Sequence, residues 1–200
     1  MKQIRLALAK DAAQISDLRI GEFNQTQDFR LLKPELLEWS DKDEASTVIG
    51  IWHDETAVAT LRLMRVADSE KANRVIEARL PVPVTFPGLV FNAAATRKAF
   101  RRRGFNQLLR YYSIRAAQAS GIQSLLSPVY QSAPRISFMR QLGYECHVLE
   151  DSWQTKLAPN SPRMICILEE KKFAAALVLL EQAIPDILQA YPWAGPPIGL

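Results

Sequence analysis

The spacing of hydrophobic and polar residues predicts strands in the first half of the chain and alternating strands and helices in the second half. Alternating polarity or short runs of β-branched residues indicate strands, and apolar residues three or four positions apart indicate helices. The predicted strands are 3–9, 46–52, 57–66, 88–96, 122–130, 146–148 and 163–168. The predicted helices begin near Asp11 and cover 32–40, 105–120, 135–143 and 172–184. Residues 66–80 show neither pattern and are expected to be irregular.

This order of elements favours a single mixed α/β domain. The runs 46–52 and 57–66 flank the polar residues 53–56 as in an antiparallel hairpin, and strands then alternate with helices. A chain of 200 residues can bury a core of its own. Its 48% hydrophobic and 23% charged residues are ordinary for a soluble globular protein.

No segment resembles a membrane span or a secretion signal. The longest apolar run, Phe173–Leu180, is far shorter than the roughly 20 residues that a membrane-spanning helix needs. The N-terminus has no apolar region of signal-peptide type, so a cytoplasmic location is expected. The helix 172–184 is apolar nearly all round, and such a helix is buried or, if exposed, contacts a second subunit. A homodimer therefore stays open.

Charge is distributed unevenly along the chain. No Asp or Glu occurs in the 67 residues from Ala78 to Tyr144, which hold ten Arg and Lys. The rest of the chain therefore has a net charge of −6, although the whole chain has +4. A surface that only serves solubility intersperses the two signs. The middle of the fold is therefore expected to face an anionic ligand or partner.

The densest positive charge lies directly before a predicted helix. Five of the seven residues from Arg97 to Arg103 are cationic, and the helix begins at Phe105. Each cation at a helix N-terminus opposes the helix dipole, at a cost of about 0.3–1 kcal/mol. The arrangement is favourable if a polyanion binds there. The free N–H groups of the first turn would donate to it, and Gly104 would permit its close approach.

A strand, the turn Arg101-x-x-Gly104-x-Asn106 and an amphipathic helix follow one another in the middle of the chain. This order resembles the acyl-CoA-binding core of the GCN5-related N-acetyltransferase superfamily. Residues 4–19 are similar to the family's opening strand and helix, and residues 132–145 to its last helix and the Gly-aromatic step after it. The resemblance covers residues 3–168. It implies a single mixed-sheet N-acyltransferase domain over 1–168, with a C-terminal helix and Pro-rich tail over 169–200 packed on or extending it.

The resemblance also implies the co-substrate and the residues that hold it. The co-substrate is acetyl-CoA or another acyl-CoA, no metal takes part, and the acyl group passes directly to a primary amine of a small molecule. The main chain of the strand would bind the pantetheine arm, and the turn with the start of the helix would bind the pyrophosphate. The implied cofactor-binding residues are Ala94, Ala95, Thr96, Arg101, Arg102, Arg103, Gly104, Phe105 and Asn106.

Three positions depart from the family's pattern. Asn106 stands where Gly or Ala is usual, and Arg135 where a small residue is common. Met139 stands where many members have the tyrosine that protonates the leaving thiolate. A thioether cannot donate a proton, so Tyr130 and Ser137 are the nearest catalytic candidates by sequence.

The acceptor amine must lose a proton before it can attack, and the carboxylate-free segment offers no base for this step. Glu77, just upstream of that segment, is the candidate base, or a base outside the segment acts through water. His53 and His147 fall in a predicted turn and a predicted strand, and each is expected to be a surface or core residue.

Two alternatives stay open. Residues 60–66 also resemble the relatives that make acyl-homoserine lactones or N-acyl amino acids, often from an acidic acyl carrier protein. A non-catalytic anion- or nucleic-acid-binding protein could use the same basic turn with nearby aromatic residues. Nucleic acid is not expected, because Phe105 and Tyr112 lie on the predicted buried stripe and the cations cluster at one end of the helix.

Other motifs are absent from the sequence. It has no P-loop, no dinucleotide-binding glycine pattern and no nucleophile elbow. Two Cys and two His at scattered positions do not form a zinc site. The two cysteines, Cys146 and Cys166, imply no disulfide, and Cys166 is expected to be an inert thiol in the core.

Overall fold

A seven-stranded sheet runs through the chain in the order β1-β2-β3-β4-β5-β7-β6. It is seen in a computed structural model that describes residues 2–23, 37–152, 155 and 162–200. Neighbouring strands are antiparallel except β4 and β5, which are parallel. The strands are β1 (Lys2–Leu6), β2 (Thr47–His53), β3 (Thr56–Val66), β4 (Gly88–Thr96), β5 (Ser124–Tyr130), β6 (Glu145–Val148) and β7 (Arg163–Glu169).

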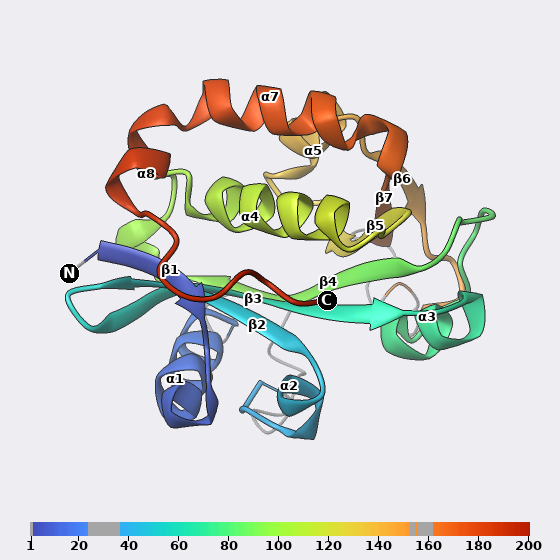
Figure 1. Cartoon of the computed structure of the whole chain (residues 1–200). Coiled ribbons are helices and arrows are strands. Elements are labelled where there is room, and N and C mark those ends of the chain that lie inside the picture. Colours follow the sequence, from blue (N-terminus) through green and yellow to red (C-terminus); the bar gives the residue numbers. More distant parts are fainter. Residues whose placement is uncertain (1, 24–36, 153–154, 156–161) are drawn as a thin grey trace.

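Helices cover both faces of the sheet (Figure 1). On one face lie α4 (Phe105–Ala119), α5 (Ile136–Gln141), α7 (Phe173–Ala183) and α8 (Pro185–Ala190). On the other face lie α1 (Ala12–Phe23) and α2 (Asp41–Glu44). The element α3 (Ser69–Ile76) follows the long strand β3 at one end of the sheet. This architecture confirms the mixed α/β class and the single mixed sheet expected from the sequence.

Short-range sequence features explain the local structure. Asp54 and Glu55 have φ of 48° and 68°, so they form the two-residue turn between β2 and β3 that fits the twist of a hairpin. Along α4, apolar residues face the sheet and join the main core, among them Phe105, Leu108 and Leu109, each at most 2% exposed. The predictions for the strand 88–96 and the helix at 105–120 are confirmed to within a residue.

Three segments differ from the sequence expectations. Residues 66–80 contain the helix α3, whose N-terminus is capped by the Asp68 carboxylate, which accepts the Lys71 N–H at 2.8 Å. The tail expected after residue 184 begins with the short helix α8. The helix expected over 32–40 lies largely outside the described residues, and residues 37–40 are not helical.

The expectation that the two cysteines form no disulfide is wrong. Cys146 on β6 lies directly opposite Cys166 on β7, and the two side chains form a disulfide. Cys166 is therefore not a free thiol. The pairing depends on the register of two neighbouring strands, so the spacing in the sequence did not indicate it.

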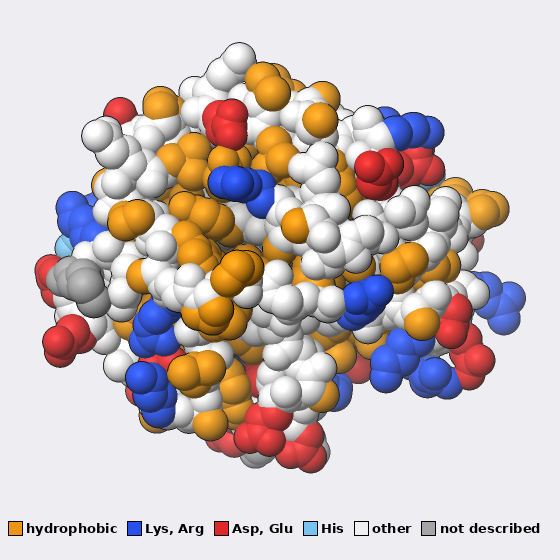
Figure 2. All heavy atoms as spheres, in the orientation of Figure 1, with side chains coloured by type: hydrophobic (Ala, Val, Ile, Leu, Met, Phe, Trp, Pro, Cys, Tyr) orange, Lys and Arg blue, Asp and Glu red, His pale blue; other side chains and the backbone are white. Residues whose placement is uncertain are grey.

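The C-terminal segment packs against the rest of the described chain. Phe173, Ala176 and Leu180 of α7 are buried in the same core as α4. Beyond α8, the chain lies alongside β1, where the Ala194 N–H donates to the Ile4 carbonyl oxygen at 2.8 Å. Figure 2 shows apolar side chains gathered across this face of the molecule, with charged groups mainly around its edge. No helix among the described residues is long and apolar enough to cross a membrane.

The two parallel strands at the centre of the sheet, β4 and β5, form only a short ladder and then diverge. β4 pairs with β5 only at Gly88, Leu89 and Val90, so no described strand pairs with its second half on that side. On its other side, β4 has a bulge in which Ala93 and Ala94 lie opposite a single residue of β3, and Ala93 has φ of 49°. The sheet is therefore open between β4 and β5, and the open edge carries free main-chain groups.

A buried ionic network contacts the second half of β4 on the face of the sheet that α1 and α2 cover. The Asp43 carboxylate of α2 accepts from Arg19 of α1 at 2.7 Å and from Arg62 of β3 at 3.2 Å. Arg62 also donates through Nε to the Asn92 side-chain oxygen of β4 at 2.7 Å. Asp43 is 1% exposed, so its charge balances two guanidinium groups in a place that water does not reach.

Removal of the Asp43 carboxylate should therefore destabilise the protein strongly. We expect Asp43→Ala to lower the free energy of unfolding by about 3–5 kcal/mol, because it leaves buried guanidinium charge without compensation. Glu44→Ala, an exposed site in the same helix, should change it by less than about 0.5 kcal/mol. Chemical denaturation of both variants measures the difference. Equal effects would show that the network contributes little.

Candidate functional site

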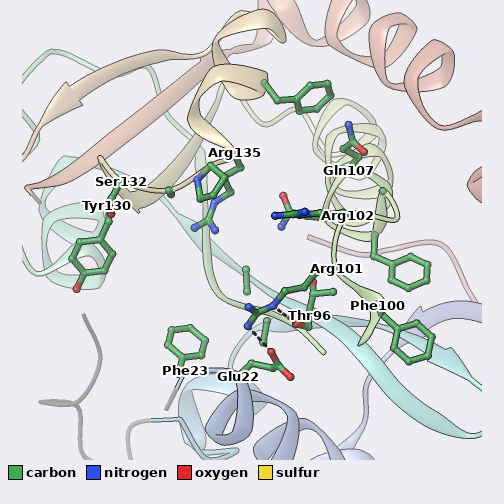
Figure 3. A pocket seen from close by; sticks show the side chains of 18 residues that line it. Glu22, Phe23, Thr96, Phe100, Arg101, Arg102, Gln107, Tyr130, Ser132 and Arg135 are labelled. Carbon is green, nitrogen blue, oxygen red and sulfur yellow. Dashed lines mark hydrogen bonds and ion pairs between the residues drawn. The ribbon is translucent and has the colours of Figure 1, made fainter. Parts of the chain in front are cut away.

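A cavity of about 600 Å³ opens where β4, the basic turn and the start of α4 meet. Its other side is formed by the end of β5 and by residues that lead into α5 (Figure 3). The described residues that line it are Glu22, Phe23, Ala94, Ala95, Thr96, Phe100, Arg101, Arg102, Gly104, Phe105, Asn106, Gln107, Tyr130, Ser132, Ala133, Pro134, Arg135 and Phe138. All of the sequence-predicted cofactor-binding residues except Arg103 are among them.

The turn before α4 presents an unusual number of free main-chain donors. Within the described part of the chain, the N–H groups of the six residues 102–107 have no hydrogen-bond acceptor. Arg102 and Gly104 both have positive φ, of 60° and 81°, which curls the amides toward one side. Curled amides of this kind at a helix N-terminus form a concave site for an anion, because each N–H is a donor and the helix dipole adds positive potential.

The adjacent arginines of the turn differ in their contacts, and Figure 3 shows two of them, Arg101 and Arg102. Arg102 extends into the cavity. Arg101 lies at its edge, where it donates to the Glu22 carboxylate at 2.6 Å and to the Thr96 carbonyl oxygen at 3.3 Å. Arg103 does not line the cavity, and its guanidinium lies 5.2 Å from the centre of the Phe100 ring. Arg102 is therefore the cation of this group best placed to meet a ligand.

A second cavity of about 590 Å³ adjoins the first and occupies the opening between β4 and β5. The two cavities share Phe23, Ala94, Tyr130 and Arg135, so they form two parts of one cleft. Seven cationic residues and two carboxylates line the second cavity. The cations are Lys42, Arg62, Lys71, Arg74, Arg110, Arg135 and Arg163, and the carboxylates are Asp41 and Glu77. The potential in this part of the cleft is therefore positive.

The structure separates the sequence-predicted catalytic candidates. Tyr130 lies at the junction of the two cavities, and Glu77 lines the second. Ser137 is exposed on α5 and lines neither cavity. Met139 is fully buried in the main core. His53 lies at the end of β2, where its Nδ1 is 2.7 Å from the Tyr191 hydroxyl, away from both cavities.

Sequence reasoning did not single out several residues of the cleft. Glu22 and Phe23 close one side of the first cavity from the end of α1, and Asn92 and Arg110 line the second. These residues come from elements far apart in the chain, and no local motif connects them. The absence of carboxylates between residues 78 and 144 indicated part of the positive cleft, because α4, β4, β5 and α5 come from that stretch and bring Arg102, Arg110 and Arg135. The other cations of the second cavity come from outside it: Lys42, Arg62, Lys71, Arg74 and Arg163.

No group of three or more His, Cys, Asp or Glu side chains that could hold a metal ion is present in the described ranges. The donors at the site are backbone amides and guanidinium groups instead, which bind anions.

The fold matches solved acyltransferase structures. A structure of the CoA-dependent acyl-homoserine lactone synthase BjaI with SAM and isopentyl-CoA aligns with a TM-score of 0.70 and 16% identity, over 99% of this chain and 96% of that one. An N-acetyltransferase from Staphylococcus aureus Mu50 aligns with a TM-score of 0.59 and 10% identity, over 85% and 99%. The ribosomal-protein-S18-alanine N-acetyltransferase from Escherichia coli gives 0.55 and 14%, over 84% and 94%.

At these identities the likeness defines the fold. The chain has the mixed-sheet fold of the GCN5-related N-acetyltransferases and the acyl-homoserine lactone synthases, as the sequence led us to expect. No protein-family model and no curated protein sequence matches the chain.

The fit of Gly104 in the turn can be tested directly. A Cβ atom there would lie 2.9 Å from Ile184 Cγ2, and the φ of 81° disfavours any other residue. Gly104→Ala should lower the free energy of unfolding by about 2–4 kcal/mol. At Gly121, φ is 66° but nothing lies within 4 Å of the added atom. Gly121→Ala should therefore cost only about 1–2 kcal/mol, the strain of the backbone alone.

Thermal or chemical denaturation of these two variants measures the difference. Equal losses of stability would mean that α8 does not pack closely against the turn.

Proposed function

We propose that the protein is an N-acyltransferase that transfers an acyl group from acyl-CoA to a primary amine. The observation that carries this proposal is the set of N–H groups at residues 102–107, which have no acceptor among the described residues; five of these six residues line a cavity that continues along the open edge of β4. A pyrophosphate matches the curled amides and the Arg102 side chain in both charge and geometry.

The remainder of the acyl-CoA fits the same cleft. Beyond Val90, β4 has no partner on the β5 side, so its main chain can form hydrogen bonds with an extended amide-containing arm, as an added strand would. Ala94 and Ala95 have small side chains that leave this edge accessible. The thioester would then lie near the junction of the two cavities, beside Tyr130, and the amine would enter from the second cavity.

The bound thioester supplies an acyl carbon that is open to nucleophilic attack. The amine nitrogen forms the new C–N bond, the C–S bond breaks, and the sulfur leaves with the electron pair of that bond. One proton must leave the nitrogen and one must reach the sulfur. The positive second cavity assists the first of these steps, because neighbouring cations lower the pKa of an ammonium group and favour its neutral form.

We assign the proton transfers to residues of the cleft. Tyr130 at the junction would protonate the leaving thiolate. Met139, which stands at the position of the family's usual tyrosine, has no proton to donate. Glu77 in the second cavity would accept the amine's proton, directly or through water. Ser137 lies outside both cavities, which argues against the other candidate from the sequence.

CoA binding tests the co-substrate assignment. CoA should raise the melting temperature of the wild-type protein, because a ligand that binds only the folded state stabilises it. Arg102→Glu should weaken CoA binding by at least about tenfold, since it places a negative charge beside the pyrophosphate. Arg115→Glu makes the same charge change on an exposed residue of α4 that lines neither cavity, and it should leave the affinity nearly unchanged.

Isothermal titration calorimetry measures both affinities. If the two variants lost affinity equally, the effect would come from overall charge and the turn would not be the binding site.

Turnover tests the role of Tyr130. Tyr130→Phe removes only the hydroxyl group, so it should lower kcat by about 10²-fold or more while CoA affinity stays the same. Ser137→Ala should leave kcat unchanged. Release of free thiol from acetyl-CoA, measured with pooled primary amines, reports the rate. A fully active Tyr130→Phe variant would mean that another group, or water, protonates the sulfur.

Synthesis of acyl-homoserine lactones is a second candidate within the same chemistry. It is supported by the higher TM-score of 0.70 to BjaI, over 99% of this chain, compared with 0.55–0.59 to the two acetyltransferases. In this second candidate the acyl donor could also be an acyl carrier protein, because an acidic carrier protein would be attracted by the basic turn. Release of thiol from acyl-CoA with S-adenosylmethionine as the amine, and with no other amine, distinguishes it from general N-acetylation.

A further inference from the structure

Arg110 lies at the floor of the second cavity without a carboxylate partner in the described chain. It projects from α4 toward the opening between β4 and β5 and is only 2% exposed. Its nitrogens donate to three neutral oxygens: Asn106 Oδ1 at 3.1 Å, Ser127 Oγ at 3.0 Å and the Tyr144 hydroxyl at 3.2 Å. These contacts hold the guanidinium in place and leave its charge uncompensated.

Arg135 brings a second guanidinium to the same region. It lines both cavities, and its side chain extends into the space between them (Figure 3). Its Nε atom is buried and has no hydrogen-bond acceptor among the described residues. Burial, together with the nearby charge of Arg110, lowers the pKa of Arg135 to about 10, so the group is still protonated at neutral pH. Two positive charges therefore lie close together.

Three other buried or half-buried arginines, Arg5, Arg19 and Arg62, have acidic partners. Arg19 and Arg62 share the Asp43 carboxylate, and Arg5 donates to both oxygens of Asp11 at 2.8 and 2.9 Å. A buried charge without a partner is expensive, because the protein interior does not replace its hydration. The Arg110–Arg135 pair is therefore expected to receive its counter-charge from a molecule that enters the cleft.

We propose that Arg110 and Arg135 bind the carboxylate group of a ligand between β4 and β5. The inference rests on the proposed function and narrows its substrate class. A carboxylate accepts two parallel hydrogen bonds from a guanidinium, and such pairs are strongest where water is excluded. Asn106, the residue that departs from the family's usual Gly or Ala, acquires a role in this arrangement: its side-chain oxygen orients Arg110.

Two ligands of the reaction could supply this carboxylate. One is the acyl group, if the co-substrate is the thioester of a dicarboxylic acid, whose free end would lie beyond the thioester. The other is the acceptor, if the amine belongs to an amino acid. Arg135 lies at the junction of the cavities, so it is within the reach of either ligand. In both cases the Arg110–Arg135 pair would favour the ligand that carries a carboxylate over a neutral ligand of the same size.

The first arm of the test compares two acyl-CoA probes with the same four-carbon chain. Succinyl-CoA ends in a carboxylate and butyryl-CoA in a methyl group. If the acyl group supplies the carboxylate, calorimetry should show at least about tenfold tighter binding of succinyl-CoA by the wild-type protein.

The second arm compares acceptors on the CoA-saturated protein. L-valine and L-phenylalanine are paired with isobutylamine and phenethylamine, which lack the carboxylate. If the acceptor supplies the carboxylate, the amino acids should bind at least about tenfold more tightly than the matched amines. They should also release thiol from acetyl-CoA faster.

Two variants test whether the carboxylate preference comes from Arg135. Arg135→Met keeps much of the side-chain volume and removes the charge, so it should reduce the carboxylate preference to less than about threefold. Its circular dichroism spectrum and its thermal unfolding transition should stay close to those of the wild type, which shows that the variant is folded. Arg140→Met removes an exposed charge from α5, outside both cavities, and should keep the full preference.

The outcomes separate this inference from the proposed function. A carboxylate preference in either arm that is lost in Arg135→Met supports the inference, and the arm identifies the source. CoA binding without a preference in either arm, or a preference that survives Arg135→Met, overturns the inference and leaves the acyl-CoA assignment intact. If CoA does not bind the wild-type protein, the proposed function fails and the inference fails with it.

Discussion

The parting of β4 and β5 after three residue pairs is the constraint on which the rest of the site depends. A sheet that stayed closed would pair every main-chain group of β4 and leave no cleft. The opening frees one edge of β4, and the bulge at Ala93 and Ala94 interrupts its regular pairing with β3 in the same half of the strand. The buried network around Asp43 holds the same stretch of β4 from the opposite face, through Arg62 and Asn92. Stability and site geometry are therefore coupled at this strand.

Electrostatics gives the open cleft its selectivity. Carboxylates are excluded from the stretch of sequence that builds most of it, and the described residues of the second cavity include seven cations and two acids. At one end, free amides and Arg102 surround a space that suits a pyrophosphate. At the other end, Arg110 and Arg135 have no carboxylate partner among the described residues. A cleft with an excess of positive charge favours anionic ligands, and we expect such a ligand to stabilise the fold by compensating that charge.

The sequence predicted the elements that depend on local patterns and missed those that depend on distant contacts. The strand at 88–96, the helix at 105–120 and the glycine turn between them follow from periodicity and from the Arg101-x-x-Gly104 motif, so the fold and the first cavity could be anticipated. The Cys146–Cys166 disulfide depends on strand register, and the helix α3 has a cap at Asp68 but few apolar residues. The roles of Glu22 and Arg110 arise from packing between elements far apart in the chain. Such contacts have no signature in a single sequence.

Hydrogen exchange at the main-chain amides of residues 102–107 tests the central claim most directly. These N–H groups have no acceptor in the part of the chain that the structure describes, so they should exchange rapidly in the free protein. Saturation with CoA should slow their exchange markedly if the pyrophosphate accepts their hydrogen bonds, while the amides near Ser120 at the far end of α4 change little. Protection elsewhere in the chain, with residues 102–107 still exchanging at the rate of the free protein, would contradict the account.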